Sequence, residues 1–199
     1  MEILRDKAIM LRVRNPKQIT TAIPNSKELP MNKVVVKWGL DEVLSLRSLN
    51  INAPSPITKR YSWPGQYTPF DHQKDTASFM TLNKKSFCFN EQGTGKTASA
   101  IWAADYLMTQ GKVKRVLVVC PLSIMDSAWR NDLFSFAMHR TVDVAHGSKQ
   151  KRKKIINSGA EFVIINYDGV EVVRDEIAAG GFDLFIVDEA THYKNAQTK

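Results

Sequence analysis

Apolar runs of strand length alternate with helix-length segments from Ser86 onward. This order is typical of a mostly parallel sheet covered by helices. The expected strands are Phe87–Phe89, Val116–Cys120, Val142–Ala145, Phe162–Asn166 and Leu184–Val187, and the expected helices lie near 96–109, 126–138, 148–157 and 170–179. The pattern therefore predicts an α/β fold for this part of the chain.

Residues 1–60 follow a different pattern, in which short apolar stretches are separated by Asn, Pro, Ser and Lys. Here we expect a small antiparallel sheet and one short helix, which Asp41 would cap. The expected strands are Ile9–Arg14, Ile19–Ile23 and Val34–Trp38, and the apolar face of the helix would carry Val43, Leu44, Leu46 and Leu49. Pro54, Pro56, Pro64 and Gly65 mark a linker. The sequence thus predicts a small mixed domain over 1–60 and an α/β domain over 61–199.

The positive charge of the chain is concentrated in the first of these two domains. The 199 residues include 28 Lys and Arg against 20 Asp and Glu, a formal charge of +8. Residues 1–60 alone hold 11 basic and 5 acidic side chains. A basic excess of this kind suits a polyanionic partner such as nucleic acid.

Cysteine content and hydropathy narrow the class of protein further. Cys88 and Cys120 are the two cysteines, and both lie in apolar runs, so neither a disulfide framework nor zinc-ligand spacing is present. The N-terminal sequence lacks the apolar core of a signal peptide, and no stretch reaches the roughly 18 apolar residues of a membrane span. We expect a soluble protein of a reducing compartment, cytoplasmic or, in a eukaryote, nuclear, with no membrane partner.

A glycine-rich segment over 90–97 carries the clearest chemical signal. It reads Asn-Glu-Gln-Gly-Thr-Gly-Lys-Thr, follows an expected strand and opens an expected helix, as a phosphate-binding loop does. Glycines let successive backbone N–H groups point at phosphate oxygens, Lys96 would reach the β- and γ-phosphates, and the Thr97 hydroxyl would bind Mg²⁺. The general pattern has glycine where this chain has Asn90. The candidate nucleotide-binding residues of this segment are Gln92, Gly93, Thr94, Gly95, Lys96 and Thr97.

Two adjacent acids follow the last expected strand, Leu184–Val187. The carboxyl end of a buried parallel strand lies at the sheet edge where a phosphate loop also lies. Asp188 would then complete the Mg²⁺ shell, and Glu189 would orient or deprotonate the attacking water. Lys96, Asp188 and Glu189 are therefore the candidate catalytic residues.

Together these segments resemble the first motor lobe of superfamily-two helicase-like ATPases, most closely the Swi/Snf-type DNA translocases. The family's adenine-reading glutamine corresponds to Gln73 in this chain. The family loop usually begins Asp-Glu, which accounts for Asn90 and Glu91. Two further segments resemble family motifs that lie near the nucleic-acid backbone. The first holds Pro121, Leu122 and Ser123 and is followed by Trp129, and the second holds Asn166 and Tyr167.

The resemblance implies a RecA-like P-loop lobe that uses ATP and Mg²⁺ and acts on DNA, expected to be duplex and bound without strong sequence preference. In one respect the sequence departs from the family, because Thr191 stands where the family has a coupling histidine and His192 follows one position later. The family also needs a second lobe and an arginine that this chain is expected to lack, so we expect negligible ATP turnover by the chain alone. Two alternatives stay open, a strand-separating DNA or RNA helicase and a non-catalytic nucleotide-binding or regulatory module.

Weaker signals leave several roles undecided. The basic run over 149–154 would form a helix capped by Ser148, and its charges suit either a solvated face or contact with DNA. Phe70 would pack near the adenine or in the core. The basic first 60 residues would serve as a DNA-docking accessory, a partner-binding module or a support for the motor lobe, and the oligomeric state is open.

Overall fold

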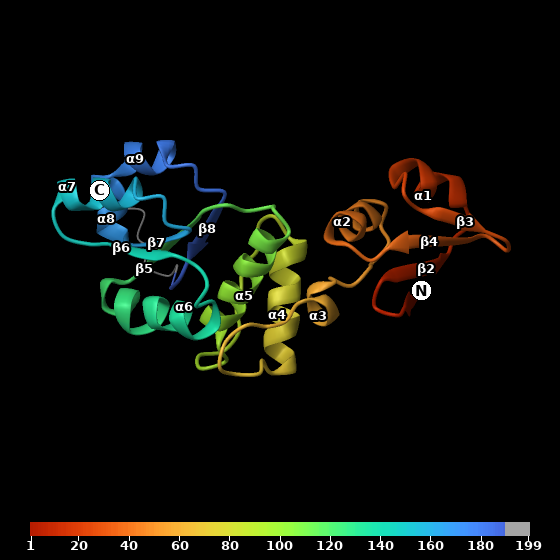
Figure 1. Ribbon diagram of the computed structural model, residues 1–199, viewed down its shortest axis with the longest axis horizontal. Coiled ribbons are helices and arrows are strands. Elements are labelled where there is room, and N and C mark those ends of the chain that lie inside the picture. Colours follow the sequence, from red (N-terminus) through yellow and green to blue (C-terminus); the bar gives the residue numbers. More distant parts are fainter. Residues whose placement is uncertain (190–199) are drawn as a thin grey trace. The chain divides into compact units, whose positions relative to one another are not determined.

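The computed structural model describes residues 1–189, and these divide into two compact units (Figure 1). The first unit comprises Met1–Ser62 with Lys74–Cys88, and the second comprises Trp63–Gln73 with the described residues from Phe89 onward. Helix α4, Asp71–Leu82, contributes residues to both units. The domain boundary near residue 60 stays a prediction, because a division by contacts does not test independent folding.

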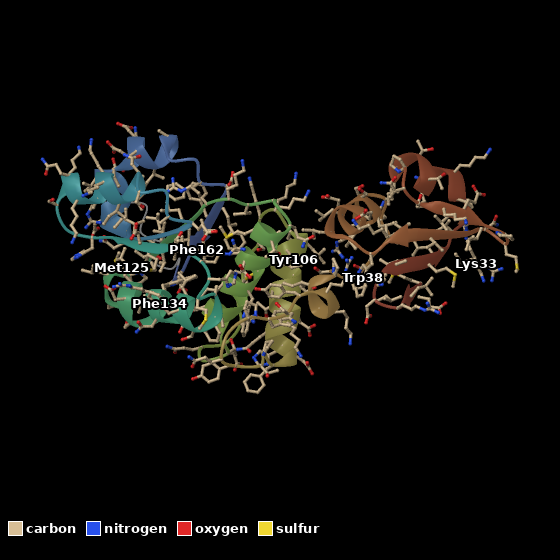
Figure 2. The ribbon with its side chains drawn as sticks, in the orientation of Figure 1. Lys33, Trp38, Tyr106, Met125, Phe134 and Phe162 are labelled. Atoms are coloured by element: carbon tan, nitrogen blue, oxygen red, sulfur yellow. The ribbon has the colours of Figure 1, made fainter. Side chains whose placement is uncertain are left out.

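The first unit is built on a four-stranded antiparallel sheet in the order β1-β2-β4-β3. Its elements are β1 (Glu2–Leu4), β2 (Ala8–Arg12), α1 (Pro16–Ala22), β3 (Lys27–Leu29), β4 (Lys33–Lys37), α2 (Leu40–Ser48) and α3 (Ile57–Arg60). Alternate residues of β2 and β4, among them Ile9 and Val36, are buried with Trp38 in one apolar core. Figure 2 shows Trp38 among the side chains of this unit. The expected small antiparallel sheet is confirmed.

Two expectations for the first unit are wrong in detail. The segment Ile19–Ile23 is not a strand, because Pro16 starts helix α1 at its first turn and Ile19 and Ile23 lie four residues apart on its buried side. Asp41 does not cap α2, since Gly39 is the N-cap residue and Asp41 lies in the first helical turn. An acidic residue in the first turn is stabilised by the positive end of the helix dipole.

The second unit contains a four-stranded parallel sheet in the order β6-β7-β5-β8. Its elements are α5 (Lys96–Thr109), β5 (Val116–Cys120), the 3₁₀ helix η1 (Leu122–Ile124), the π-helix η2 (Met125–Arg130), α6 (Asn131–Phe136), β6 (Val142–Ala145), α7 (Lys149–Ile156), β7 (Phe162–Asn166), α8 (Tyr167–Val172), α9 (Arg174–Ala179) and β8 (Leu184–Val187). All five residues of β5 and of β7 are buried, as expected for central strands covered on both faces.

Helices cover the parallel sheet on both sides. In Figure 1, α6 lies on one side of the sheet and α7, α8 and α9 lie on the other. On the latter side Leu117 and Val163 of the sheet pack with Ile156 of α7 and Ile177 of α9. The strands predicted at β5, β6, β7 and β8 have the expected bounds, and the α/β fold is confirmed.

Three details of the second unit differ from the expectation. Phe87–Phe89 forms no strand, and its two phenylalanines are 76% and 89% exposed, since an apolar pattern alone does not specify strand pairing. The helix expected over 126–138 begins with the 3₁₀ and π turns η1 and η2 and ends at Phe136. The helix expected over 170–179 is two short helices, α8 and α9, separated at Val173.

Candidate nucleotide site

The glycine-rich loop ends at the N-terminus of α5, which begins at Lys96. Gly95 is the N-cap residue with φ of +76°, and Gly93 has φ of +80°, a left-handed conformation that glycine adopts without a steric penalty. The first N–H groups of a helix lack intrahelical partners and carry its positive dipole end. The loop and α5 therefore have the local geometry of an anion site.

Gln73 is bound to this loop from the start of α4. Its Nε2 donates to the Thr94 carbonyl at 3.3 Å, and its Oε1 accepts from the Phe70 backbone N–H at 2.9 Å. A Cβ added at Gly95 would lie 2.1 Å from the Gln73 Nε2, so the glycine is needed for the amide to lie there. The structure thus brings the predicted adenine-reading residue against the predicted phosphate loop.

Phe70 lies beside this glutamine, on the surface. It is 68% exposed, and its ring stacks on His72 with the ring centroids 5.7 Å apart. The core role considered for Phe70 is therefore wrong, since a core side chain is shielded from water. The nucleotide-packing role stays a prediction.

Lys96 closes the loop in the structure. Its ammonium donates to the backbone carbonyls of Asn90 at 3.0 Å and Glu91 at 2.9 Å, and the Thr94 hydroxyl also donates to the Glu91 carbonyl. These carbonyls hold the charged group at the loop, where a phosphate oxygen would be a stronger, charge-assisted acceptor. The ammonium of Lys96 is thus held at the glycine-rich loop, and its role toward phosphate stays a prediction. Gln92 is exposed and Thr97 is half-buried.

Asp188 follows β8 at the carboxyl edge of the parallel sheet. Its backbone N–H donates to Val119 of β5 at 2.9 Å, which extends the ladder by one residue. Its carboxylate accepts from the indole Nε1–H of Trp129 at 3.0 Å through Oδ2, and from the Glu189 backbone N–H at 2.9 Å through Oδ1. The hydroxyl of Tyr167 donates to the Asp188 carbonyl. Both the main chain and the side chain of Asp188 are therefore held in place.

The surroundings of Asp188 are electronegative. Burial, and then the charges of Asp188 and Glu189, raise the pKa of the Cys120 thiol to about 12. Glu189 is exposed and has φ of +51°, a left-handed conformation that is uncommon for a residue with a side chain and that recurs at functional sites. A divalent cation would offset the negative charge collected at this strand end.

The donor set fits Mg²⁺ bound together with a nucleotide. Mg²⁺ takes oxygen ligands and is usually held by one or two carboxylates with phosphates and waters. The Thr97 hydroxyl and the Asp188 carboxylate would be such ligands, and each Asp188 oxygen keeps a lone pair beyond its one hydrogen bond. Within residues 1–189 no three His, Cys, Asp or Glu side chains gather as a metal site, so the phosphates would supply the remaining ligands. Thr191 and His192 lie outside the described residues.

The residues predicted to contact nucleic acid lie at the carboxyl ends of β5 and β7, at the same end of the sheet. Leu122 and Ser123 are exposed and Pro121 is half-buried. Asn166 is buried, and its Oδ1 accepts from Arg152 at 2.8 Å. The contacts of all these residues with nucleic acid, Tyr167 included, stay predictions.

Arg152 does not belong to a solvated helix face, although its neighbours in the basic run are mostly exposed. Its guanidinium is buried and donates to the carbonyls of Ala145, the last residue of β6, and Gly147, two residues further on. Ser148 caps α7 as predicted, accepting from the Lys151 N–H. The sequence gave no sign that Arg152 differs from the other basic residues of the run, because its three acceptors come together only in the fold.

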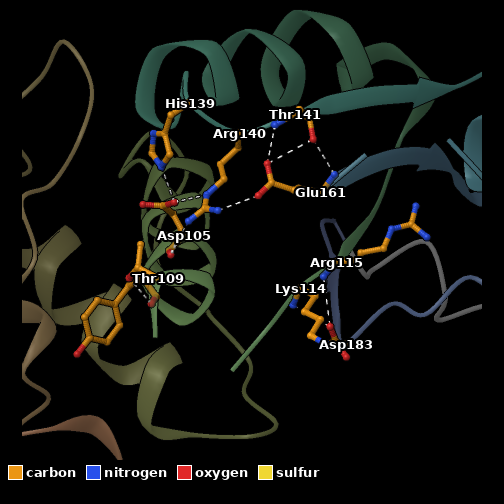
Figure 3. Close-up of polar contacts among 10 residues, drawn as sticks. Asp105, Thr109, Lys114, Arg115, His139, Arg140, Thr141, Glu161 and Asp183 are labelled. Carbon is orange, nitrogen blue, oxygen red and sulfur yellow. Dashed lines mark hydrogen bonds and ion pairs between the residues drawn. The ribbon is translucent and has the colours of Figure 1, made fainter. Parts of the chain in front are cut away.

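A second polar cluster, unforeseen from the sequence, joins α5 to the start of the sheet (Figure 3). Asp105 is 1% exposed, and its Oδ1 lies 2.5 Å from Arg140 Nε and 2.8 Å from His139 Nε2. Arg140 also donates to Glu161 at 2.8 Å, and Glu161 accepts from the Thr141 backbone N–H at 2.8 Å. This cluster ties the helix that follows the phosphate loop to the strands β6 and β7.

Fold and loop together define a class: an α/β RecA-like lobe whose glycine-rich loop opens a helix and whose parallel strand ends in an acid. The chain matches the SNF2-related domain over residues 72–199 and belongs to that family of helicase-like ATPases. Within the described residues no helix is long and apolar enough to cross a membrane.

Individual relatives and a solved structure agree with this assignment. The chain is 27% identical over 137 residues to the uncharacterized ATP-dependent helicase YqhH of Bacillus subtilis, covering 67% of this chain and 23% of that protein. It is 24% identical over 146 residues to Switch 2 of Arabidopsis thaliana, covering 65% of this chain and 17% of that protein. The Sulfolobus solfataricus SWI2/SNF2 ATPase core in complex with dsDNA matches with a TM-score of 0.58 and 26% identity, over 68% of this chain and 29% of that one. The chain thus spans less than a third of each of these proteins.

Proposed function

We propose that this chain binds ATP with Mg²⁺ and forms the first lobe of a DNA-dependent ATPase that moves along duplex DNA when a second lobe is present. The observation that carries the proposal is the contact between Gln73 and the glycine-rich loop at the start of α5. The Gln73 amide would bind the adenine of a nucleotide and the loop would bind its phosphates. Because the two groups lie within hydrogen-bonding distance of each other, one nucleotide could contact both.

Each residue has a physical task in the proposed site. The N–H groups of the loop and the positive end of α5 would receive the phosphates, and Lys96 would exchange its backbone carbonyls for phosphate oxygens. Mg²⁺, held by Thr97 and Asp188, would offset phosphate charge. Glu189 would orient or deprotonate the attacking water, which its exposed position at the strand end allows.

Duplex DNA is the proposed partner because the solved structure that the chain resembles is an ATPase core in complex with dsDNA. Backbone N–H and small hydroxyl donors at the ends of β5 and β7 suit phosphate contacts without base reading. A strand-separating helicase is the second candidate, since the Bacillus relative bears that name. Comparing the affinity of the chain for duplex and single-stranded DNA of equal length separates the two: equal or weaker binding to duplex would contradict the first proposal.

The nucleotide site is tested by titrating a fluorescent ATP analogue into the chain with and without Mg²⁺. Lys96→Ala should abolish binding, and Gln73→Ala should remove the preference for ATP over GTP as competitor. Lys154→Ala, at an exposed lysine on α7, is the matched control and should bind as the wild type does. Binding that survives Lys96→Ala unchanged, or wild-type binding that GTP matches, would contradict the proposed site.

A further inference from the structure

We propose that Trp129 is a positioning residue for Asp188, holding its carboxylate in the orientation that receives Mg²⁺. The inference rests on the proposed nucleotide site and goes beyond it, since it concerns a residue that touches neither nucleotide nor metal. The indole Nε1–H of Trp129 donates to Asp188 Oδ2 at 3.0 Å, and the Trp129 side chain is 1% exposed.

The hydrogen bond leaves the carboxylate able to bind a cation. An indole is a donor only, so the buried N–H of Trp129 needs an acceptor, and the acceptor it has is charged. Oδ1 is held in turn by the Glu189 N–H. Because each carboxylate oxygen has about two acceptor positions, both keep one that is open to a metal or its water. The side chain is thus held by two hydrogen bonds and keeps one acceptor position on each oxygen.

The local backbone explains how a tryptophan reaches this carboxylate. Strand β5 pairs with β8, so the segment that leaves β5 passes beside the end of β8. That segment winds as the π-helix η2, in which Met125 and Trp129 are both buried. π-Helical turns are rare and are found often at functional sites. Tyr167 adds a second restraint, since its hydroxyl donates to the main-chain carbonyl of Asp188.

Preorganisation of a metal ligand raises metal affinity, because a free carboxylate must lose rotamer freedom before it binds. Loss of a hydrogen bond to a metal ligand typically lowers metal affinity about 10–100-fold. We therefore expect Trp129→Phe, which keeps an aromatic ring and removes the donor, to raise the Mg²⁺ concentration needed for half-maximal binding of the fluorescent ATP analogue by about 10–100-fold. Binding measured without Mg²⁺ should change little.

Trp102→Phe is the matched control. Trp102 lies in the same unit, is also 1% exposed, and donates its Nε1–H at 2.9 Å to the carbonyl of Pro64, which is no part of the proposed site. A general loss of packing would affect both variants alike. The inference requires a raised Mg²⁺ midpoint in Trp129→Phe and a wild-type midpoint in Trp102→Phe.

A second measurement reads the hydrogen bond directly and remains available if Trp129→Phe fails to fold. The four tryptophans give four indole N–H signals in a ¹H–¹⁵N spectrum of the chain, and phenylalanine variants at Trp38, Trp63 and Trp102 assign the fourth by elimination. Asp188→Asn should shift the Trp129 signal in the absence of nucleotide, because the charged acceptor becomes neutral. Mg²⁺ with nucleotide should shift it more than the Trp102 signal.

The possible results separate the two proposals. The positioning role would be overturned if a folded Trp129→Phe variant had the wild-type Mg²⁺ midpoint, or if Asp188→Asn did not shift the Trp129 signal. Neither result would contradict the nucleotide site. Wild-type chain without any Mg²⁺-dependent binding would overturn the nucleotide site, and the positioning role with it.

Discussion

Replacing Arg140 by Met should destabilise the second unit strongly, because Arg140 is the centre of the polar cluster in Figure 3. Its guanidinium pairs with Asp105 at 2.5 Å and with Glu161 at 2.8 Å. Met retains most of the apolar stem and removes both pairs. After the substitution the carboxylate of Asp105, which is 1% exposed, keeps its contact with His139.

The size of the loss follows from the burial of the group left behind. Removing one partner of a buried ion pair costs about 3–5 kcal/mol, since a charge remains out of water without compensation. His139 stays in place and is protonatable, so we expect the lower end of that range, about 3 kcal/mol. At about 2–4 °C per kcal/mol, the melting temperature should fall by about 6–12 °C.

Urea unfolding followed by tryptophan fluorescence at pH 7 measures this loss. Arg130→Met is the control, because Arg130 pairs with Asp126 at 3.3 Å while both side chains are more than half exposed, and such pairs contribute about 0–1 kcal/mol. Adding Asp105→Asn to Arg140→Met should restore part of the stability, since an amide needs no counter-charge. If Arg140→Met costs no more than Arg130→Met, the buried pair does not stabilise the unit and the reasoning fails.

Two further predictions concern Glu161 and Gly95. Burial alone would raise the pKa of Glu161, but hydrogen bonds from Thr141 and Arg140, with the charge of Arg140, outweigh it and lower the pKa below 4.5. The ionised Glu161 therefore contributes its full stabilisation above about pH 4.5, and this contribution is lost as the pH falls through the lower folded-state pKa. Glu161→Gln should reduce the stability at pH 7 and make it depend less on pH in the acid range. An unchanged dependence on pH in the acid range would contradict this. Gly95→Ala should cost about 1–2 kcal/mol from its positive φ and, by displacing the Gln73 amide, should also remove the preference for ATP over GTP. Gly93→Ala, which also has a positive φ but meets open space, should keep that preference; equal behaviour of the two variants would refute the role of the Gln73 contact.

The sheet of the second unit was predictable because its strands are short, apolar and bounded by polar segments. Val116–Cys120 and Phe162–Asn166 are buried on both faces, so their sequences are apolar throughout and can be read without knowing their partners. Phe87–Phe89 has the same local pattern and forms no strand. Pairing is a property of two segments, and one segment's composition does not specify it.

Ile19–Ile23 was predicted as a strand and forms part of a helix. All five residues of this segment are apolar or β-branched, which favours a strand, whereas the spacing of four between Ile19 and Ile23 fits a helix face equally well. Pro16 was the deciding signal, since proline at the first helical position is preorganised for a helix.

The candidate site divides in the same way between local and long-range features. Lys96 and the positive φ of Gly93 and Gly95 follow from a contiguous motif, and the start of α5 was predicted to the residue. The partners of Arg152, Asp105 and Trp129 lie 5 to 59 residues away, and no local pattern encodes them. Trp129 itself was noticed in the sequence, but its bond to Asp188 required the fold.

The outer edge of β8 favours self-association of the chain at high concentration. Among the described residues β8 pairs with β5 alone, and Phe185 and Val187 along it are 55% and 44% exposed. An edge that offers free backbone donors and acceptors beside apolar side chains is a template for a strand from another copy. The net charge of +8 opposes such encounters through repulsion, which salt screens within about 10 Å at 0.1 M. Colloidal stability of the isolated chain therefore depends on ionic strength, with self-association favoured as salt rises.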